Sequence, residues 1–113
     1  MLARVHRLRA AADFNKTYKF GRSTNADTLY IKAYQSHYVS SRVAVVASKK
    51  VSKRAVVRNR CKRRVVELVR KNWSGIKPGY NIIITIKSDI SKTPAAEVET
   101  VVLGCMSRAG LTS

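Results

Sequence analysis

Residues 42–70 read RVAVVASKKVSKRAVVRNRCKRRVVELVR, a valine-rich run followed by a long basic stretch. The run Arg42–Ser48 is almost unbroken in its apolar character, which predicts a central strand. Beyond it, apolar side chains recur at the spacing of one helical face. These positions are Val57, Cys61, Val65 and Leu68. The stretch therefore predicts a strand that leads into an amphipathic helix, which we expect to begin near Ala55.

The charged residues of the same stretch are all positive from Lys49 to Arg64. Nine of the sixteen residues from Lys49 to Arg64 are basic, and none is acidic. Arg54, Arg58 and Lys62 recur four apart, on a face that the apolar stripe does not use. Like charges at this spacing destabilise a helix by roughly a few tenths of a kcal/mol per pair. We therefore expect an anion that relieves the repulsion, and RNA or DNA phosphate is the leading candidate.

Residues that commonly cap helices are found at both expected ends of this helix. Ser52 is the candidate N-cap, and Gly75 is expected to stop the helix shortly after Trp73. Glu67 is expected to pair with a basic residue four positions away on either side. Its candidate partners are Arg63 and Lys71.

Upstream, the sequence predicts one helix and two strands. Aromatic side chains fall four apart within Ala10–Phe20, which indicates a helix, and Gly21 is expected to end it as a C-terminal glycine. Thr28–Tyr34 alternates apolar and polar residues, as a half-buried strand does. We expect this strand to form a hairpin with the valine-rich one, and a further short strand near Arg22–Thr24.

Downstream, Ile82–Ile86 predicts another buried strand, and Pro94 suits the first turn of a closing helix. The apolar positions of that helix are Val98, Val101, Val102, Cys105 and Met106. With the short strand included, the order is α-β-β-β-α-β-α. This order predicts an α+β two-layer sandwich, and residues 1–113 have the usual length of a single domain.

The composition restricts the class of partner. The chain carries 23 Lys and Arg against 6 Asp and Glu, a formal net charge of +17. Such a charge favours a polyanionic partner. A membrane is disfavoured, because the longest apolar runs have only strand length, and no apolar signal-peptide core follows Met1. We therefore expect a cytoplasmic protein that binds nucleic acid.

A second candidate site lies on the polar face of the predicted strand Thr28–Tyr34. Tyr30, Lys32 and Tyr34 share this face. A sheet face that mixes aromatic residues with lysine is typical of a stacking platform for single-stranded nucleic acid. Phe14 and Tyr18 of the preceding helix could join it, or could equally serve to dock that helix on the sheet.

The residues needed for catalysis by the protein itself are missing. Metal-dependent nucleases need clustered carboxylates, and the closest pair here, Glu97 and Glu99, does not converge on a helix. His6 and His37 have no expected acid–base partner and are predicted to lie at the surface. The two cysteines have no CxxC spacing, so we expect buried apolar side chains and no zinc site. They are Cys61 and Cys105.

The basic helix and its flanks resemble the protein component of bacterial ribonuclease P. The resemblance is carried by Ser48-Lys-Lys-Val and by Arg58-Asn-Arg followed by Lys62-Arg63. It spans residues 7–108. The weaker flanking matches are Arg7-Leu-Arg, Asp13-Phe14, Tyr18-Lys19, Gly21 and Pro78-Gly-Tyr.

The resemblance implies a subunit with no catalytic role of its own, one copy of which joins a large catalytic RNA. The complex is an endoribonuclease that removes the 5′ leader of precursor tRNA. Mg²⁺ in the complex would sit mainly on RNA and substrate phosphates, with none bound by the protein alone. The resemblance also implies a left-handed βαβ crossover through the basic helix, in the fold class named after a ribosomal protein domain. Without the resemblance we would expect the opposite hand, because about 98% of βαβ units have a right-handed crossover.

The resemblance also implies site residues. Contacts with the catalytic RNA are expected along the basic stretch: Lys49, Lys50, Lys53, Arg54, Arg58, Asn59, Arg60, Lys62, Arg63 and Arg64. A cleft for the leader is expected between the sheet face and the first helix, at Phe14, Tyr18, Tyr30, Lys32 and Tyr34. Lys32 stands where the family commonly has an aromatic residue, so stacking is expected to shift to Tyr30 or Tyr34. The glycine that many members have soon after Ser-Lys-Lys is absent.

Two other functions fit parts of the pattern. A ribosomal or other structural RNA-binding protein would have the same charge and fold class, and would co-sediment with ribosomal subunits. A helix-based DNA binder is disfavoured, because a strand at Arg42–Ala47 stands where a turn and second helix would be needed.

Overall fold

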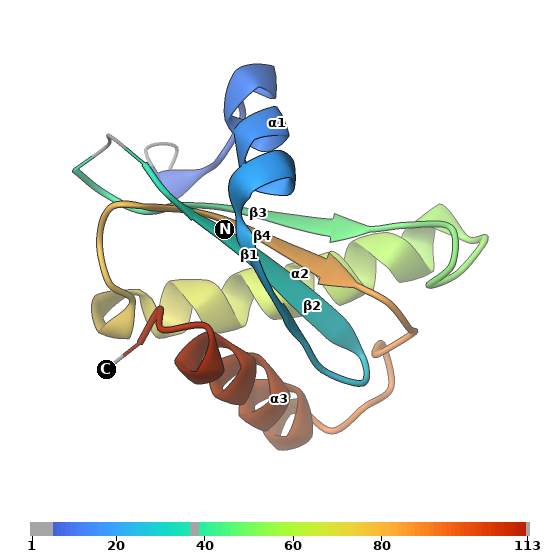
Figure 1. Cartoon of the computed structure of the whole chain (residues 1–113). Helices are drawn as coiled ribbons and strands as arrows, with labels where there is room; N and C mark the ends of the chain where they lie inside the picture. Colours follow the sequence, from blue (N-terminus) through green and yellow to red (C-terminus); the bar gives the residue numbers. More distant parts are fainter. Residues whose placement is uncertain (1–5, 37–38, 113) are drawn as a thin grey trace.

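The computed structural model describes residues 6–36 and 39–112, which fold around one four-stranded sheet (Figure 1). The predicted order α-β-β-β-α-β-α is confirmed, with a short 3₁₀ turn, η2, after the second helix. The elements are α1 (Ala11–Phe20), β1 (Arg22–Asn25), β2 (Leu29–Gln35), β3 (Arg42–Ala47), α2 (Ala55–Lys71), η2 (Trp73–Gly75), β4 (Tyr80–Ile86) and α3 (Ala95–Arg108).

The strand order is β1-β2-β4-β3, which corrects two predictions for the valine-rich strand: its central position and its hairpin with β2. The valine-rich strand β3 lies at the edge of the sheet and pairs in parallel with β4 alone, so it forms no hairpin with β2. The central strand is the isoleucine-rich β4, whose Ile82, Ile83, Ile84 and Ile86 are completely buried. The apolar run of β3 therefore does not reflect a central position in the sheet. It is explained by α2, which packs against this strand, and by the N-terminal segment, which covers part of its outer edge. There the Leu8 N–H donates to the Val43 carbonyl oxygen over 3.0 Å.

The crossover from β3 through α2 to β4 has the left hand that the resemblance implies. Figure 1 views the sheet from the α1 side, with β3 above β4 and both strands pointing to the right. The helix α2 passes behind the sheet from right to left, which makes the unit left-handed. This hand is rare among βαβ units, so strand and helix periodicity alone would favour the opposite arrangement.

The core lies between one face of the sheet and the helices α2 and α3 (Figure 1). The alternation of β2 is confirmed, since Leu29, Ile31 and Ala33 are buried while the residues between them are half-exposed. On α2, Cys61 and Val65 are completely buried. The remaining members of the predicted α2 stripe, Val57 and Leu68, pack against the core from its margin. Burial raises the pKa of both cysteine thiols, Cys61 and Cys105, as expected for buried apolar side chains.

The helix α1 packs on the opposite face of the sheet, across β2 and β4 (Figure 1). Its Thr17 is completely buried and donates its hydroxyl to the Asp13 carbonyl oxygen over 2.7 Å. Ile83, which is turned away from the α2 side of β4, is completely buried as well. This face of the sheet is therefore partly covered by α1 and partly open to solvent.

Gly21 does end α1, but for a different reason from the one expected. Its φ of −71° is ordinary, so no left-handed conformation requires glycine. A Cβ at this position would stand 2.3 Å from the Thr17 carbonyl oxygen and 3.1 Å from that of Ala33. Glycine therefore lets α1 turn into β1 directly against the neighbouring strand.

We expect Gly21→Ala to lower the free energy of unfolding by about 1–3 kcal/mol, because the added methyl group must push backbone atoms apart. The matched control is Gly104→Ala within α3, where a Cβ meets nothing within 4 Å. That change should raise the free energy of unfolding by about 0.5–1 kcal/mol, since alanine favours the helix. Urea unfolding followed by circular dichroism measures both, and equal stability of the two variants would contradict the packing argument.

Candidate nucleic-acid interface

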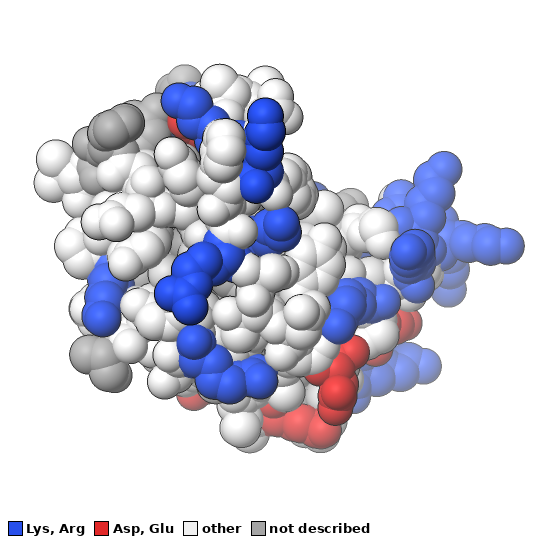
Figure 2. All heavy atoms as spheres, viewed as in Figure 1, with Lys and Arg blue, Asp and Glu red and all other residues white. Residues whose placement is uncertain are grey.

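Cationic side chains gather where β3 leads into α2. Figure 2 shows Lys and Arg side chains fanning out at this end of the molecule, while Asp and Glu side chains group near the start of α3. Most of the predicted RNA contacts are exposed there and, within residues 6–36 and 39–112, their side chains take part in no hydrogen bond or ion pair. These are Lys49, Lys50, Lys53, Arg54, Arg60, Lys62 and Arg63, of which Lys62 is half-buried. They form the basic surface of α2 and can all bind an external anion.

The start of α2 is held by Arg58, not by a serine cap. The N-cap position is Arg54, whose N–H donates to the Ser52 hydroxyl over 3.1 Å, so the prediction of Ser52 as N-cap is wrong by two residues. The Arg58 Nη1 donates to the carbonyl oxygens of Ser52 and Lys53, at 2.9 and 3.0 Å. This guanidinium therefore orders the loop ahead of the helix, and only its remaining donors are available to RNA.

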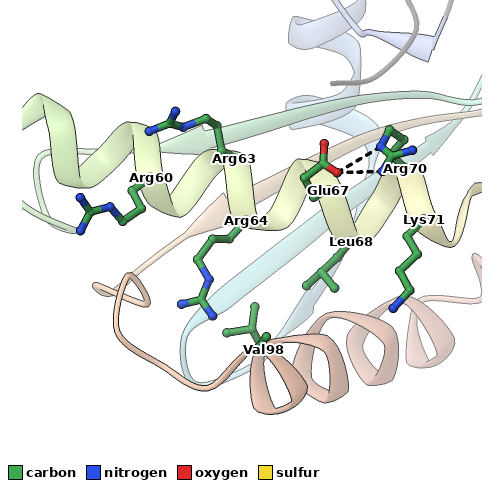
Figure 3. Close-up of a pocket in the computed structure, with 9 residues that line it drawn as sticks. Arg60, Arg63, Arg64, Glu67, Leu68, Arg70, Lys71 and Val98 are labelled. Carbon is green, nitrogen blue, oxygen red and sulfur yellow. Dashed lines mark hydrogen bonds and ion pairs between the residues drawn. The ribbon is translucent and has the colours of Figure 1, made fainter.

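Arg64 points away from the basic surface of α2 and toward the start of α3. Its two terminal nitrogens donate to the carbonyl oxygens of Ile90 and Thr93, the second over 2.5 Å. Figure 3 shows Arg64 directed toward α3 while Arg63 lies on the opposite side of α2. The structure thus gives Arg64 a bracing role between α2 and the loop before α3, and its side chain also lines a cavity of about 410 Å³. Its predicted contact with RNA remains a prediction.

Glu67 pairs with Arg70, three residues on, and not with either of the expected partners. The Glu67 carboxylate accepts hydrogen bonds from the Arg70 Nε and Nη2 at 3.2 and 2.9 Å (Figure 3). The Arg70 hydrogen bonds are the leading cause that lowers the pKa of Glu67 to about 2. Lys71 instead approaches Glu99 of α3, at 3.7 Å. Arg63 is thereby left without an acidic partner among the described residues.

The aromatic face forms where α1 crosses β2. The Lys32 Nζ donates to the Tyr18 carbonyl oxygen over 2.8 Å, so this lysine ties the end of α1 to the sheet. The rings of Phe14 and Tyr18 stack with their centroids 6.4 Å apart, and Tyr18 is 41% exposed. Tyr30 is half-buried on the same strand face as Lys32. The five predicted cleft residues are thus brought to one side of the sheet, although Lys32 is already engaged by the backbone.

Phe20 joins this face, and the sequence prediction did not include it. Its ring is 61% exposed and lies 6.3 Å from the ring of Tyr34. The Lys19 Nζ approaches the same ring, 5.4 Å from its centroid. The register of β1 and β2 aligns Arg22 with Ala33, which brings the end of α1 beside Tyr34. That register was the missing signal, because the sequence indicated a strand near Arg22–Thr24 without its partner.

Residues 6–36 and 39–112 contain no group of three His, Cys, Asp or Glu side chains placed to hold a metal ion. No helix among these residues is long and apolar enough to span a bilayer. His6 is half-buried and stacks on Trp73, with ring centroids 4.1 Å apart, so it is less of a surface residue than predicted. The second histidine, His37, lies outside the described residues.

Comparison with known proteins connects this fold and surface to one family. The family model for ribonuclease P matches residues 2–110. The ribonuclease P protein component of Pseudanabaena sp. (strain PCC 6903) is 39% identical over 93 residues, which are 81% of this chain and 80% of that protein. The corresponding protein of Alkaliphilus oremlandii is 34% identical over 107 residues, 95% of this chain and 93% of its own length.

Solved structures show the same fold. A mutant of the Staphylococcus aureus ribonuclease P protein with defective mRNA degradation activity superposes with a TM-score of 0.86 at 22% identity, covering 95% of this chain and 90% of that one. The Thermotoga maritima ribonuclease P protein, bound to 1-(4-fluorophenyl)-2-thiourea, gives 0.81 at 26% identity, over 90% and 98%.

The fold and the basic helix thus define a small α+β protein built around a left-handed βαβ unit, with a strongly cationic helix packed on one face of its sheet against the edge strand β3. The match over residues 2–110 and the similarity to relatives over most of their own length make the assignment specific. This chain belongs to the ribonuclease P protein component family.

Proposed function

We propose that this protein is the non-catalytic subunit of ribonuclease P and that it binds the catalytic RNA through the basic surface of α2. The observation that carries the proposal is the set of cations there that have no partner among the described residues, in a chain of net charge +17 that belongs to this family. Phosphates supply the missing counter-charge, and the fixed spacing of a helix lets several of these cations act together. One protein binds one catalytic RNA in the cytoplasm.

The second surface serves the substrate. Phe14, Tyr18 and Tyr30, with the Phe20–Tyr34 pair, offer ring faces on the open side of the sheet. Unpaired bases of the 5′ leader of precursor tRNA stack on such faces without a strong sequence requirement. Lys32 holds α1 against the sheet, so stacking is centred on Tyr34 and Phe20 and not on position 32.

The chemistry of cleavage belongs to the RNA in this proposal. Hydrolysis of the phosphodiester needs Mg²⁺, whose preferred ligands are oxygens, and RNA and substrate phosphates provide them. The protein contributes positive charge and a fixed position for the leader.

The test is single-turnover cleavage of precursor tRNA by the organism's own catalytic RNA, at a magnesium concentration too low for the RNA alone. Adding the protein is expected to raise the cleavage rate at the mature 5′ end by at least tenfold, because the added cations replace magnesium in screening RNA phosphates. Absence of stimulation would refute the proposal. Co-sedimentation with ribosomal subunits under the same conditions would instead favour a structural ribosomal protein.

We expect Tyr34→Ala to weaken the binding of leader-bearing tRNA to the assembled complex by about 5- to 20-fold, the loss expected for one stacked base. Phe20→Ala should have a similar effect, because the two rings form one pair. Binding of mature tRNA, which has no leader, should be unchanged. Equilibrium dissociation constants for the two tRNAs measure the difference, and an equal loss for both would contradict the leader assignment.

A further inference from the structure

A second groove opens on the outer side of α2, between that helix, β3 and the N-terminal segment. Its volume is about 760 Å³, within the usual range of ligand pockets. The N-terminal wall is fixed, since the Leu8 N–H bonds the Val43 carbonyl oxygen and Leu8 itself is buried. The opposite wall is the regular backbone of α2. The groove is therefore a formed depression between two ordered elements.

The groove is lined by apolar side chains. Val45 of β3 and Val66 of α2 are half-buried in its lining, and Val56 near the start of α2 is 60% exposed. An exposed valine on a helix crowded with arginine gains nothing from a bound phosphate, because phosphate offers no apolar surface. An occupant that covers Val56 must present an apolar face to it.

Cationic side chains line the groove on both sides, and the carboxylate of Glu67, which also lines it, is engaged by Arg70. Arg9 stands on the N-terminal wall and Lys62 and Arg63 on the helical wall, and their side chains take part in no hydrogen bond or ion pair within the described residues. Asn59, one turn after Val56, adds an exposed amide that both donates and accepts. The occupant is therefore flat and apolar at its centre, polar at its edge and anionic on two sides.

An unpaired nucleotide has these properties, so we propose that one unstacked base of the catalytic RNA inserts into this groove. Its face covers Val56 and Val66, and its edge meets the Asn59 amide. Its two flanking phosphates lie against Arg9 and against Lys62 and Arg63. This inference rests on the proposed function, because it assigns a particular nucleotide contact to the partner RNA.

The test uses the organism's catalytic RNA made by transcription, with Val56→Ala and the control Val39→Ala. Both variants should fold, because Val39 is 91% exposed and Val56 is 60% exposed. Val39 does not line the groove. Val56→Ala is expected to bind about tenfold more weakly. The slope of log affinity against log salt concentration should not change, because no phosphate contact is lost. Val39→Ala should bind like the unchanged protein.

Base-specific chemical probing locates the nucleotide. One unpaired base should be protected by the unchanged protein and exposed again in the complex with Val56→Ala. Making that nucleotide abasic should weaken binding by the same factor for the unchanged protein and have no further effect on Val56→Ala. Normal binding by Val56→Ala, or the absence of a base that responds to it, would overturn the inference. Failure of the unchanged protein to bind the RNA at all would instead overturn the proposed function.

Discussion

Simultaneous replacement of Arg60, Lys62 and Arg63 by alanine is expected to weaken binding of the catalytic RNA by roughly 100- to 1000-fold near physiological salt. Each side chain lies on α2 without a partner in the described chain, so each can form a charge-assisted bond to phosphate. The loss corresponds to about 1–1.4 kcal/mol for each of three such contacts. The slope of log affinity against log salt concentration should become shallower by about 2–3.

A triple variant with the same net charge is the matched control. Lys77, Lys87 and Lys92 are exposed and lie outside the basic surface of α2. Their replacement by alanine removes three positive charges from other places, so only weak long-range attraction is lost. Equal losses of affinity in the two triple variants would show that total charge, and not the position of cations on α2, determines binding.

Replacement of Arg64 by alanine is expected to lower the free energy of unfolding by about 2–3 kcal/mol. The variant leaves the carbonyl oxygens of Ile90 and Thr93 without their donor and loosens the loop ahead of α3. Arg60→Ala, one turn earlier on the same helix, should leave stability within about 0.5 kcal/mol of the original, because that side chain has no partner in the described chain.

The salt dependence of RNA binding should distinguish the two variants in the opposite way: the variant that keeps its stability is the one whose RNA binding changes. For folded Arg64→Ala the salt slope of RNA binding should be unchanged, whereas Arg60→Ala should make it shallower by about 1. Urea unfolding and salt-dependent titration of the same samples give both quantities. An Arg64→Ala protein of full stability whose salt slope is shallower by about 1 would show that Arg64 binds phosphate and braces nothing.

The elements of this fold were predictable because their periodicity is local. The α2 stripe at Cys61 and Val65 and the alternation of β2 both follow from spacing within one segment. Pairing is not local. An apolar run such as Arg42–Ala47 is consistent with a central strand, yet its burial comes from α2 and the N-terminal segment, while β4 occupies the centre.

The location of the candidate site in the basic stretch could be predicted from the sequence, but the binding partner of each side chain could not. Charge identified the basic stretch, but residue type does not show whether a guanidinium meets an RNA phosphate or a carbonyl of its own chain. Arg64 and Arg58 are bonded internally, and Lys32 is bonded to Tyr18. Phe20 was missed because its place beside Tyr34 depends on the register of β1 against β2.

The strand order also governs how the chain is completed during synthesis. β4 pairs with β2 on one side and β3 on the other, although both neighbours precede it in the chain by more than thirty residues. Until Tyr80–Ile86 has left the ribosome, β2 and β3 have no central partner and expose edges open to mispairing. The cationic helix is already made at that stage, so the nascent protein presents its strongest charge before it has a sheet on which to fold.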